Sequence, residues 1–151
     1  MISAAAFPAG PEYRAGEFSY EIESAGAGAN GTFLYKVTCT AQNPPAAADA
    51  ASACAVHGVI FKGTAAAGAN PAQTPLFNGE ELTDGQKTAL DGIFDGKHWK
   101  KYVPQVATGS MKIAKMKKGY RVEATVAVDK RKLRLDLEQA GVVEKLGSMF
   151  N

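Results

Sequence analysis

Apolar and polar residues alternate in four short parts of the chain, which is the pattern of strands that bury one face. These parts are residues 18–23, 33–39, 111–115 and 120–128. The last is the clearest, because every second residue from Tyr120 to Val128 is apolar or aromatic. We therefore expect a strand at each of the four.

Turn residues connect these strands in pairs. Asn30-Gly31 tolerates positive φ at both positions, so it predicts a tight turn and an antiparallel hairpin between the first two strands. Residues 25–31, which are rich in glycine and alanine, are expected to end the first strand. Lys117-Lys118-Gly119 predicts a turn between the last two strands.

Two helices are expected between the hairpins. Asn43-Pro44-Pro45 stops the second strand, and proline suits the first turn of a helix, so a helix should cover residues 46–61. It is rich in alanine, and its stripe of small side chains would let it lie close against a sheet. A second helix should start at the capping box Thr83-Asp-Gly-Gln86 and end at Gly96.

A third helix is expected over residues 130–140, with Asp129 as its N-cap and Gly141 as its terminating glycine. Residues 98–103 fit either the end of the second helix or a short strand. Residues 63–79 are rich in alanine, glycine, proline and threonine, and we expect them to form a long, mobile surface loop.

The predicted order of elements is β-β-α-α-β-β-β-α. Antiparallel hairpins with intervening helices indicate an α+β fold, namely a single two-layer domain with a mostly antiparallel sheet and helices on one face. We expect this domain over residues 17–151. Residues 1–16 show little periodicity and are expected to be a flexible lead-in.

The composition is that of a folded domain. The 151 residues are 46% hydrophobic and 21% charged, which is enough to bury a core. No segment approaches the roughly 20 apolar residues of a membrane-spanning helix. The N-terminus lacks the basic segment and apolar core of an intact signal peptide. We therefore expect either an exported protein whose signal has been removed or a cytoplasmic one.

Residues that commonly catalyse reactions or bind metals are few. The two cysteines and two histidines do not have a recognised metal-ligand spacing, and no phosphate-binding glycine motif is present. Cys39 and Cys54 are expected to be buried free thiols, with a disulfide in an oxidising compartment as the alternative. His57 lies three residues after Cys54, a spacing that is only weak support for thiol catalysis. We expect no enzymatic activity, cofactor or metal.

The net charge of +2 hides an uneven distribution. Residues 1–96 carry 4 basic and 10 acidic side chains, whereas residues 97–151 carry 13 basic and 5 acidic ones. Aromatic residues are interleaved with the basic ones, a combination that can bind a nucleic acid, an acidic glycan or anionic lipid. The alternatives are that the lysines keep a sheet edge soluble or that the acidic half neutralises them.

If the basic segment 97–134 binds a polyanion, the binding residues are expected on the last two strands and their turn. They are Lys112, Lys115, Lys117, Lys118 and Arg121. Such binding would weaken steeply with salt.

Two stretches, which cover about a third of the chain, resemble known proteins. Residues 35–63 run from Tyr35-Lys-Val-Thr-Cys-Thr-Ala41 into the alanine-rich helix, and residues 119–141 run from Gly119-Tyr-Arg-Val-Glu-Ala to Glu138-Gln-Ala-Gly141. They resemble small exported proteins of Gram-negative gut bacteria, and more loosely envelope lipoprotein modules of the flagellar-assembly and curli-secretion kinds. The resemblance implies an extracytoplasmic, non-enzymatic α+β module.

These observations together favour a non-catalytic binding or assembly module of the cell envelope, periplasmic or at the outer envelope, with a protein partner there. The alternative is a polyanion binder that uses the basic segment. The residues expected to contact a protein partner are the aromatic pair Trp99 and Tyr102 and the loop residues Leu76 and Phe77.

Overall fold

The structure is a computed structural model that describes residues 13–14 and 16–144. It confirms a single α+β domain with the predicted order of elements. The strands and helices are β1 (Glu21–Ala27), β2 (Phe33–Ala41), α1 (Ala47–Phe61), α2 (Asp84–Phe94), β3 (Gln105–Val106), β4 (Lys112–Lys115), β5 (Tyr120–Val128) and α3 (Lys130–Gln139). Four short 3-10 helices connect them: η1 (Ala29–Gly31), η2 (Pro44–Ala46), η3 (Asp95–Tyr102) and η4 (Thr108–Ser110).

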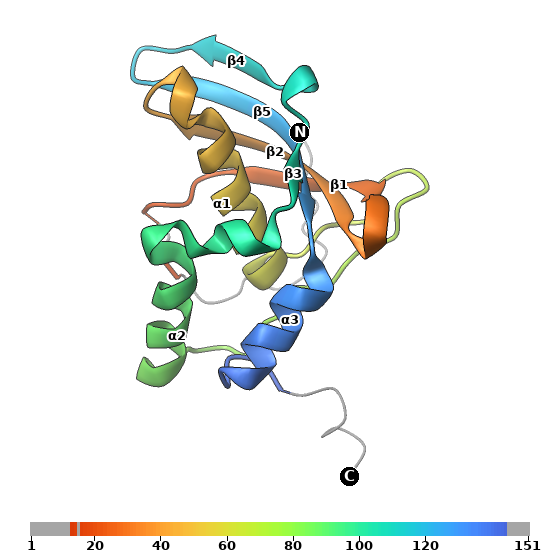
Figure 1. Cartoon of the computed structure of the whole chain (residues 1–151), viewed down its shortest axis with the longest axis vertical. Coiled ribbons are helices and arrows are strands. Elements are labelled where there is room, and N and C mark those ends of the chain that lie inside the picture. Colours follow the sequence, from red (N-terminus) through yellow and green to blue (C-terminus); the bar gives the residue numbers. More distant parts are fainter. Residues whose placement is uncertain (1–12, 15, 145–151) are drawn as a thin grey trace.

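The sheet is antiparallel throughout and has the order β1-β2-β5-β3, with β4 also paired to β5 (Figure 1). The long central pair β2–β5 runs without a register shift from Phe33↔Val128 to Ala41↔Tyr120. Both strands have the strict alternation that the sequence shows, because one of their faces is buried and the other is solvated. The two best predicted strands therefore form the centre of the sheet.

Helix α1 covers the buried face of the sheet (Figure 1). Its small residues allow close packing: a methyl group added at Gly58 would lie 2.8 Å from Ile22 Cδ1 and 3.1 Å from Tyr20 Cε2. The far side of α1 is covered as well, because the Tyr13 ring stacks with His57 and the Phe94 ring of α2 packs at a tilt against it. Helix α1 is therefore enclosed on nearly all sides, in keeping with its mostly apolar sequence.

Several local predictions are confirmed. Asn30 and Gly31 both have positive φ in the turn between β1 and β2. Helix α2 begins with the predicted capping box, in which Thr83 and Gln86 exchange backbone and side-chain hydrogen bonds. At the start of α3, the Asp129 side chain accepts from the backbone N–H of Lys132.

Two boundaries differ from the sequence analysis. Residues 25–27 were expected to lie beyond the first strand, but β1 continues to Ala27 through a register shift between Ser24 and Gly26. Gly26 has φ +106°, so the glycine bends the strand instead of ending it. Residues 98–102 form the end of η3 and not a strand, Val103 caps this helix, and the short β3 follows at Gln105–Val106.

The loop over residues 63–79 is anchored at its base and at its end. Thr64 and Gln73 form a two-hydrogen-bond bridge, each at 2.9 Å. The backbone N–H groups of Leu76 and Phe77 donate to the carbonyls of Val59 and Ile60 in the last turn of α1. The prediction of a loose surface loop is therefore wrong for these parts, and the exposed residues lie mainly at the tip and around residue 74.

The start of the chain is described only in part. Residues 1–12 and 15 of the predicted lead-in lie outside the described residues. Tyr13 is buried, and the Arg14 guanidinium lies 2.8 Å from Asp91 and 2.9 Å from Asp95 of the α2–η3 segment. Over the described ranges, none of the helices combines the length and apolar character needed to cross a bilayer.

Candidate functional site: the basic hairpin of β4 and β5

The candidate site is the hairpin formed by residues 112–123, which we call the basic hairpin. Four residue pairs, from Lys112↔Glu123 to Lys115↔Tyr120, join β4 to the first half of β5. The turn closes with a 3.0 Å hydrogen bond from the Met116 N–H to the Gly119 carbonyl. Gly119 has φ +78° and a Cβ there would lie 2.7 Å from the Ala41 carbonyl oxygen, so the turn requires glycine.

The basic hairpin lies at the end of the sheet away from α2 and α3 (Figure 1). All four residues of β4 are exposed, on both faces of the strand. In an ordinary edge strand that packs on a core, alternate residues would be buried. The β4 side of the hairpin therefore contributes little to the core and is available for contact.

The five predicted polyanion-binding residues are all exposed and all lie on this hairpin. They are Lys112, Lys115, Lys117, Lys118 and Arg121. The hairpin has one carboxylate, Glu123, whose Oε2 lies 2.8 Å from Arg121 Nη1. This contact holds the pKa of Glu123 below its ordinary value. The net charge of the hairpin is therefore strongly positive.

The cations are spread over both faces of the hairpin. Lys112 and Arg121 flank Glu123 on the face of the sheet that α1 leaves open. Lys115 projects from the other face, where its Nζ lies 5.5 Å from the centre of the Tyr120 ring. Lys117 and Lys118 occupy the turn. This distribution suits an extended anionic surface better than a single anionic group.

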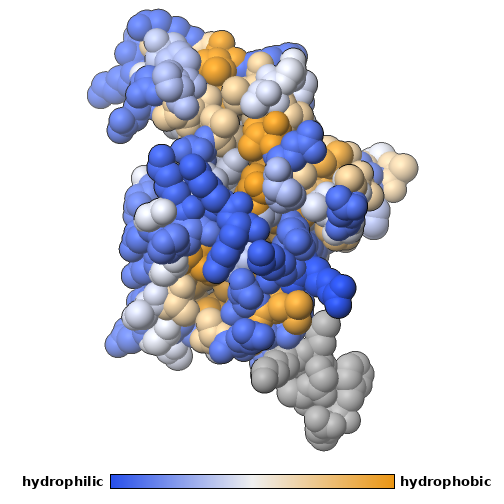
Figure 2. Space-filling model, in the orientation of Figure 1, coloured by the Kyte–Doolittle hydropathy of each residue, from blue (hydrophilic) through white to orange (hydrophobic). Residues whose placement is uncertain are grey.

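Two apolar side chains accompany the cations. Ile113 and Met116 are each 37% exposed, which is unusual for large hydrophobic residues in this protein. Figure 2 shows apolar surface among hydrophilic surface at the end of the molecule that carries β4. The alternation over residues 111–115 predicts a strand through Ile113, but it does not indicate that this side chain is exposed.

The four residues predicted to contact a protein partner lie in the core. Leu76 is 7% exposed, Phe77 6%, Trp99 5% and Tyr102 1%. Tyr102 also donates its hydroxyl to Asp136 of α3 at 2.7 Å, so it holds η3 against α3. Their burial does not support the predicted contact with a protein partner, because buried side chains do not present a docking surface in this conformation.

The cysteine and histidine of α1 are close in sequence, but the imidazole is already engaged. His57 Nδ1 lies 2.7 Å from the Tyr20 hydroxyl, and Nε2 lies 2.9 Å from the Tyr13 carbonyl oxygen. Burial lowers the pKa of His57 to about 4. With both nitrogens occupied, the ring does not offer Cys54 a general base in this arrangement.

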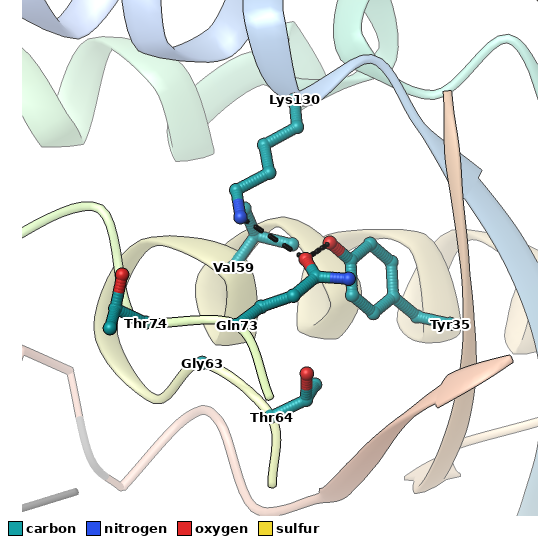
Figure 3. Close-up of a pocket in the computed structure, with 7 residues that line it drawn as sticks. All are labelled: Tyr35, Val59, Gly63, Thr64, Gln73, Thr74 and Lys130. Carbon is teal, nitrogen blue, oxygen red and sulfur yellow. Dashed lines mark hydrogen bonds between the residues drawn. The ribbon is translucent and has the colours of Figure 1, made fainter. Parts of the chain in front are cut away.

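A narrow crevice lies beside the loop anchored by Gln73 (Figure 3). The Gln73 Oε1 accepts hydrogen bonds from the Tyr35 hydroxyl and, at 3.1 Å, from the Lys130 ammonium group. Burial lowers the pKa of Lys130. The buried Thr64 hydroxyl has no hydrogen-bond partner within the described part of the chain. These side chains fill the crevice, and their contacts fasten the loop to β2 and α3.

Among the described residues, few ion pairs join the acidic half of the chain, residues 1–96, to the basic half, residues 97–151. Lys97 pairs with Asp49 at 3.0 Å, and Lys36 lies 3.8 Å from Glu123. Within residues 13–14 and 16–144, no ion pair involves the four lysines of the basic hairpin. The basic charge at this end is therefore largely uncompensated by the acidic half.

No cluster of three or more histidine, cysteine, aspartate or glutamate side chains suited to a metal ion occurs in the described ranges. The site thus consists of an edge strand and its turn at one end of the sheet, with cations on both faces and two exposed apolar residues. No protein-family model, curated protein or solved structure matches this chain.

Proposed function

We propose that this protein is a non-catalytic binding module that docks on an anionic lipid surface through the basic hairpin. The observation that carries the proposal is the exposure of all four β4 residues next to a turn with two further lysines. Because β4 is an edge strand at the end of the sheet away from α2 and α3 (Figure 1), its exposed residues can approach a flat surface without interference from these two helices.

The burial of the aromatic residues favours an anionic lipid over a nucleic acid as the ligand. Binding of single-stranded nucleic acid commonly relies on exposed rings that stack on bases. Trp99 and Tyr102, which made stacking plausible in the sequence, are buried. Tyr120 is half-buried beneath Lys115. The exposed Ile113 and Met116 instead supply apolar groups that can enter the headgroup region.

The expected affinity is modest. Each lysine or arginine close to an anionic membrane contributes about 1 kcal/mol, so a net charge of about +4 contributes about 4 kcal/mol. This corresponds to a dissociation constant of about 1 mM before any apolar contribution. Partial insertion of Ile113 and Met116 would strengthen binding. The hairpin alone therefore provides reversible attachment.

Vesicle co-sedimentation tests the proposal. The protein should bind vesicles that contain phosphatidylglycerol, should bind neutral phosphatidylcholine vesicles far less, and should dissociate as salt is raised. The double substitution Lys117→Gln/Lys118→Gln should weaken binding about 30-fold, because it removes about 2 kcal/mol of attraction.

A matched control is the double substitution Arg131→Gln/Lys132→Gln at the start of α3, which removes the same charge. These residues are exposed and lie at the opposite end of β5, about 30 Å from the turn. The control should bind almost as well as the unchanged protein. Equal losses of vesicle binding in the two variants would contradict docking through the hairpin. Equal binding of the unchanged protein to neutral and anionic vesicles would contradict it as well.

The apolar contribution has its own test. Ile113→Ser/Met116→Ser should reduce the binding that persists at high salt, with little effect on the salt-sensitive part. Preferential binding to heparin or single-stranded DNA over anionic vesicles would identify a different ligand and would refute the lipid assignment.

We further propose that the protein works outside the cytoplasm. The support is the resemblance of residues 35–63 and 119–141 to exported envelope proteins. Fractionation of the source cells, with antibody detection, tests the location. Recovery in the cytoplasmic fraction alone would refute it without affecting the vesicle assay.

A further inference from the structure

Two residues that precede β1, Tyr13 and Arg14, lie against α1 and α2, and we call this pair the strap. The Tyr13 ring is 7% exposed and packs on three aromatic side chains. Its centroid lies 5.5 Å from that of Phe61, 5.7 Å from that of Phe94 and 6.1 Å from that of His57. We call these three side chains the aromatic socket, because together they receive the Tyr13 ring.

Ion pairs fasten the strap beside the aromatic socket. The Arg14 guanidinium lies 2.8 Å from Asp91 Oδ1 and 2.9 Å from Asp95 Oδ1, and we call these two ion pairs the latch. The Tyr13 hydroxyl donates a hydrogen bond to Asp91 as well. The two carboxylate side chains are 46% and 65% exposed, so solvent and salt screen the latch. The strap is therefore held partly by interactions that weaken as the ionic strength rises.

The backbone of the strap is strained. Arg14 has φ +50°, in the left-handed region that residues other than glycine seldom adopt. Its carbonyl oxygen accepts from the backbone N–H groups of Glu17 and Phe18, at 2.9 and 3.2 Å, in a turn that leads towards β1. Such a conformation persists where surrounding contacts hold it. Loss of the latch would therefore also allow this strain to relax.

His57 connects the strap to the core and reports its position. The Tyr13 carbonyl oxygen can only accept, so His57 Nε2 carries a proton and donates it at 2.9 Å. The Tyr20 hydroxyl then donates to Nδ1 at 2.7 Å. The His57 side chain belongs to a residue that is 6% exposed. Because the strap occupies Nε2, a reagent reaches this nitrogen only after the strap has moved away.

We propose that the strap opens and closes over the aromatic socket while the sheet and its helices stay folded, and that the latch controls this opening. Opening separates Tyr13 and Arg14 from α1, α2 and Asp95 but breaks no pairing between strands. It is a local opening of the kind that folded proteins undergo without global unfolding. Raised salt favours the open state, in which the aromatic socket faces solvent beside two carboxylates.

Reaction of His57 with diethyl pyrocarbonate tests the proposal in the full chain. The modified peptides are quantified by mass spectrometry at pH 7, and the exposed His98 is the internal reference. The His57 rate should be far below that of His98 and should change little with denaturant below the unfolding transition, because strap opening exposes little surface. Relative to His98, it should rise several-fold as salt is raised from about 0.1 M to about 1 M.

The variant Arg14→Gln lacks the latch, and its His57 rate should rise about tenfold, as expected for the loss of two partly exposed ion pairs. The matched control is Lys97→Gln, which removes a cation with φ +61° that lies 3.0 Å from Asp49. The control should leave the His57 rate unchanged. Fluorescence of the buried Trp99 verifies that both variants are folded.

Two results would overturn the proposal. In the unchanged protein, a His57 rate that rises with denaturant as steeply as global unfolding does would show that the strap opens only when the whole domain unfolds. A rate that Arg14→Gln raises no more than Lys97→Gln does would show that the latch does not control the opening. The denaturant and salt series use the unchanged protein, so they decide the matter even if Arg14→Gln fails to fold.

Discussion

Acidification is expected to weaken the fold through His57. The pKa of His57 is lowered from 6.5 to about 4, mainly because burial disfavours the charged ring, and Lys62 adds a smaller contribution in the same direction. The unfolded chain therefore binds a proton on this histidine at pH values where the folded chain does not. The stability contributed by neutral His57 is fully present above pH 6.5 and is lost as the pH falls towards 4.

The magnitude follows from the shift. A difference of about 2.5 pKa units corresponds to about 3 kcal/mol, most of which is lost by pH 4.5. Asp91 and Glu123 also have lowered pKa values, but their ordinary values are 3.8 and 4.5, so they act mainly below this window. The decline between pH 6.5 and pH 4.5 should therefore come mainly from His57.

Denaturant unfolding at a series of pH values measures this effect. Trp99 is the single tryptophan and is buried, so its fluorescence reports global unfolding. His57→Gln retains an amide that can donate to the Tyr13 carbonyl oxygen but does not titrate, and it should remove the decline. His98→Gln, at an exposed position of η3, should retain the decline. An unchanged decline in His57→Gln would refute the reasoning.

Three further predictions concern backbone and capping positions. Gly58→Ala should lower the free energy of unfolding by about 1 kcal/mol, because its methyl group would lie 2.8 Å from Ile22. The control Gly92→Ala, in α2, has no neighbouring atom within 4 Å of the added methyl group, so it should raise the free energy of unfolding by up to about 1 kcal/mol; chemical denaturation compares the two variants. Thr83→Ala should cost about 1 kcal/mol through loss of the α2 cap, measured in the same way. Gly119→Ala should cost about 1–2 kcal/mol because its φ is +78°, and a neutral result by thermal unfolding would contradict the turn described for the basic hairpin.

The sequence was informative where local chemistry and tertiary structure agree. The alternation from Tyr120 to Val128 predicted the central strand because one face of the sheet is covered by α1 and the other is solvated. The capping box at Thr83 and the turn at Asn30-Gly31 depend on neighbouring residues only, so they too were predictable.

The sequence was less informative where a residue's position depends on distant parts of the chain. Trp99 and Tyr102 are buried because Gly96 and Lys97, both with positive φ, redirect η3 towards the core and α3. Nothing in the local pattern distinguishes such aromatic residues from exposed ones. Conversely, the exposure of the five basic candidate residues was predicted, since lysines beside a turn seldom have an apolar surface to cover.

The anchoring of the loop over residues 63–79 determines where the chain can change in length. Gln73, Leu76 and Phe77 have fixed partners, because Gln73 bridges to Thr64 and the backbone N–H groups of Leu76 and Phe77 donate to the carbonyls at the end of α1. Residues 66–72 are mostly exposed and close on themselves through Ala67 and Asn70. Insertions or a fused tag within residues 66–72 would therefore leave the last turn of α1 intact. A deletion that shortens the segment after Gln73 would instead expose this last turn of α1 to solvent.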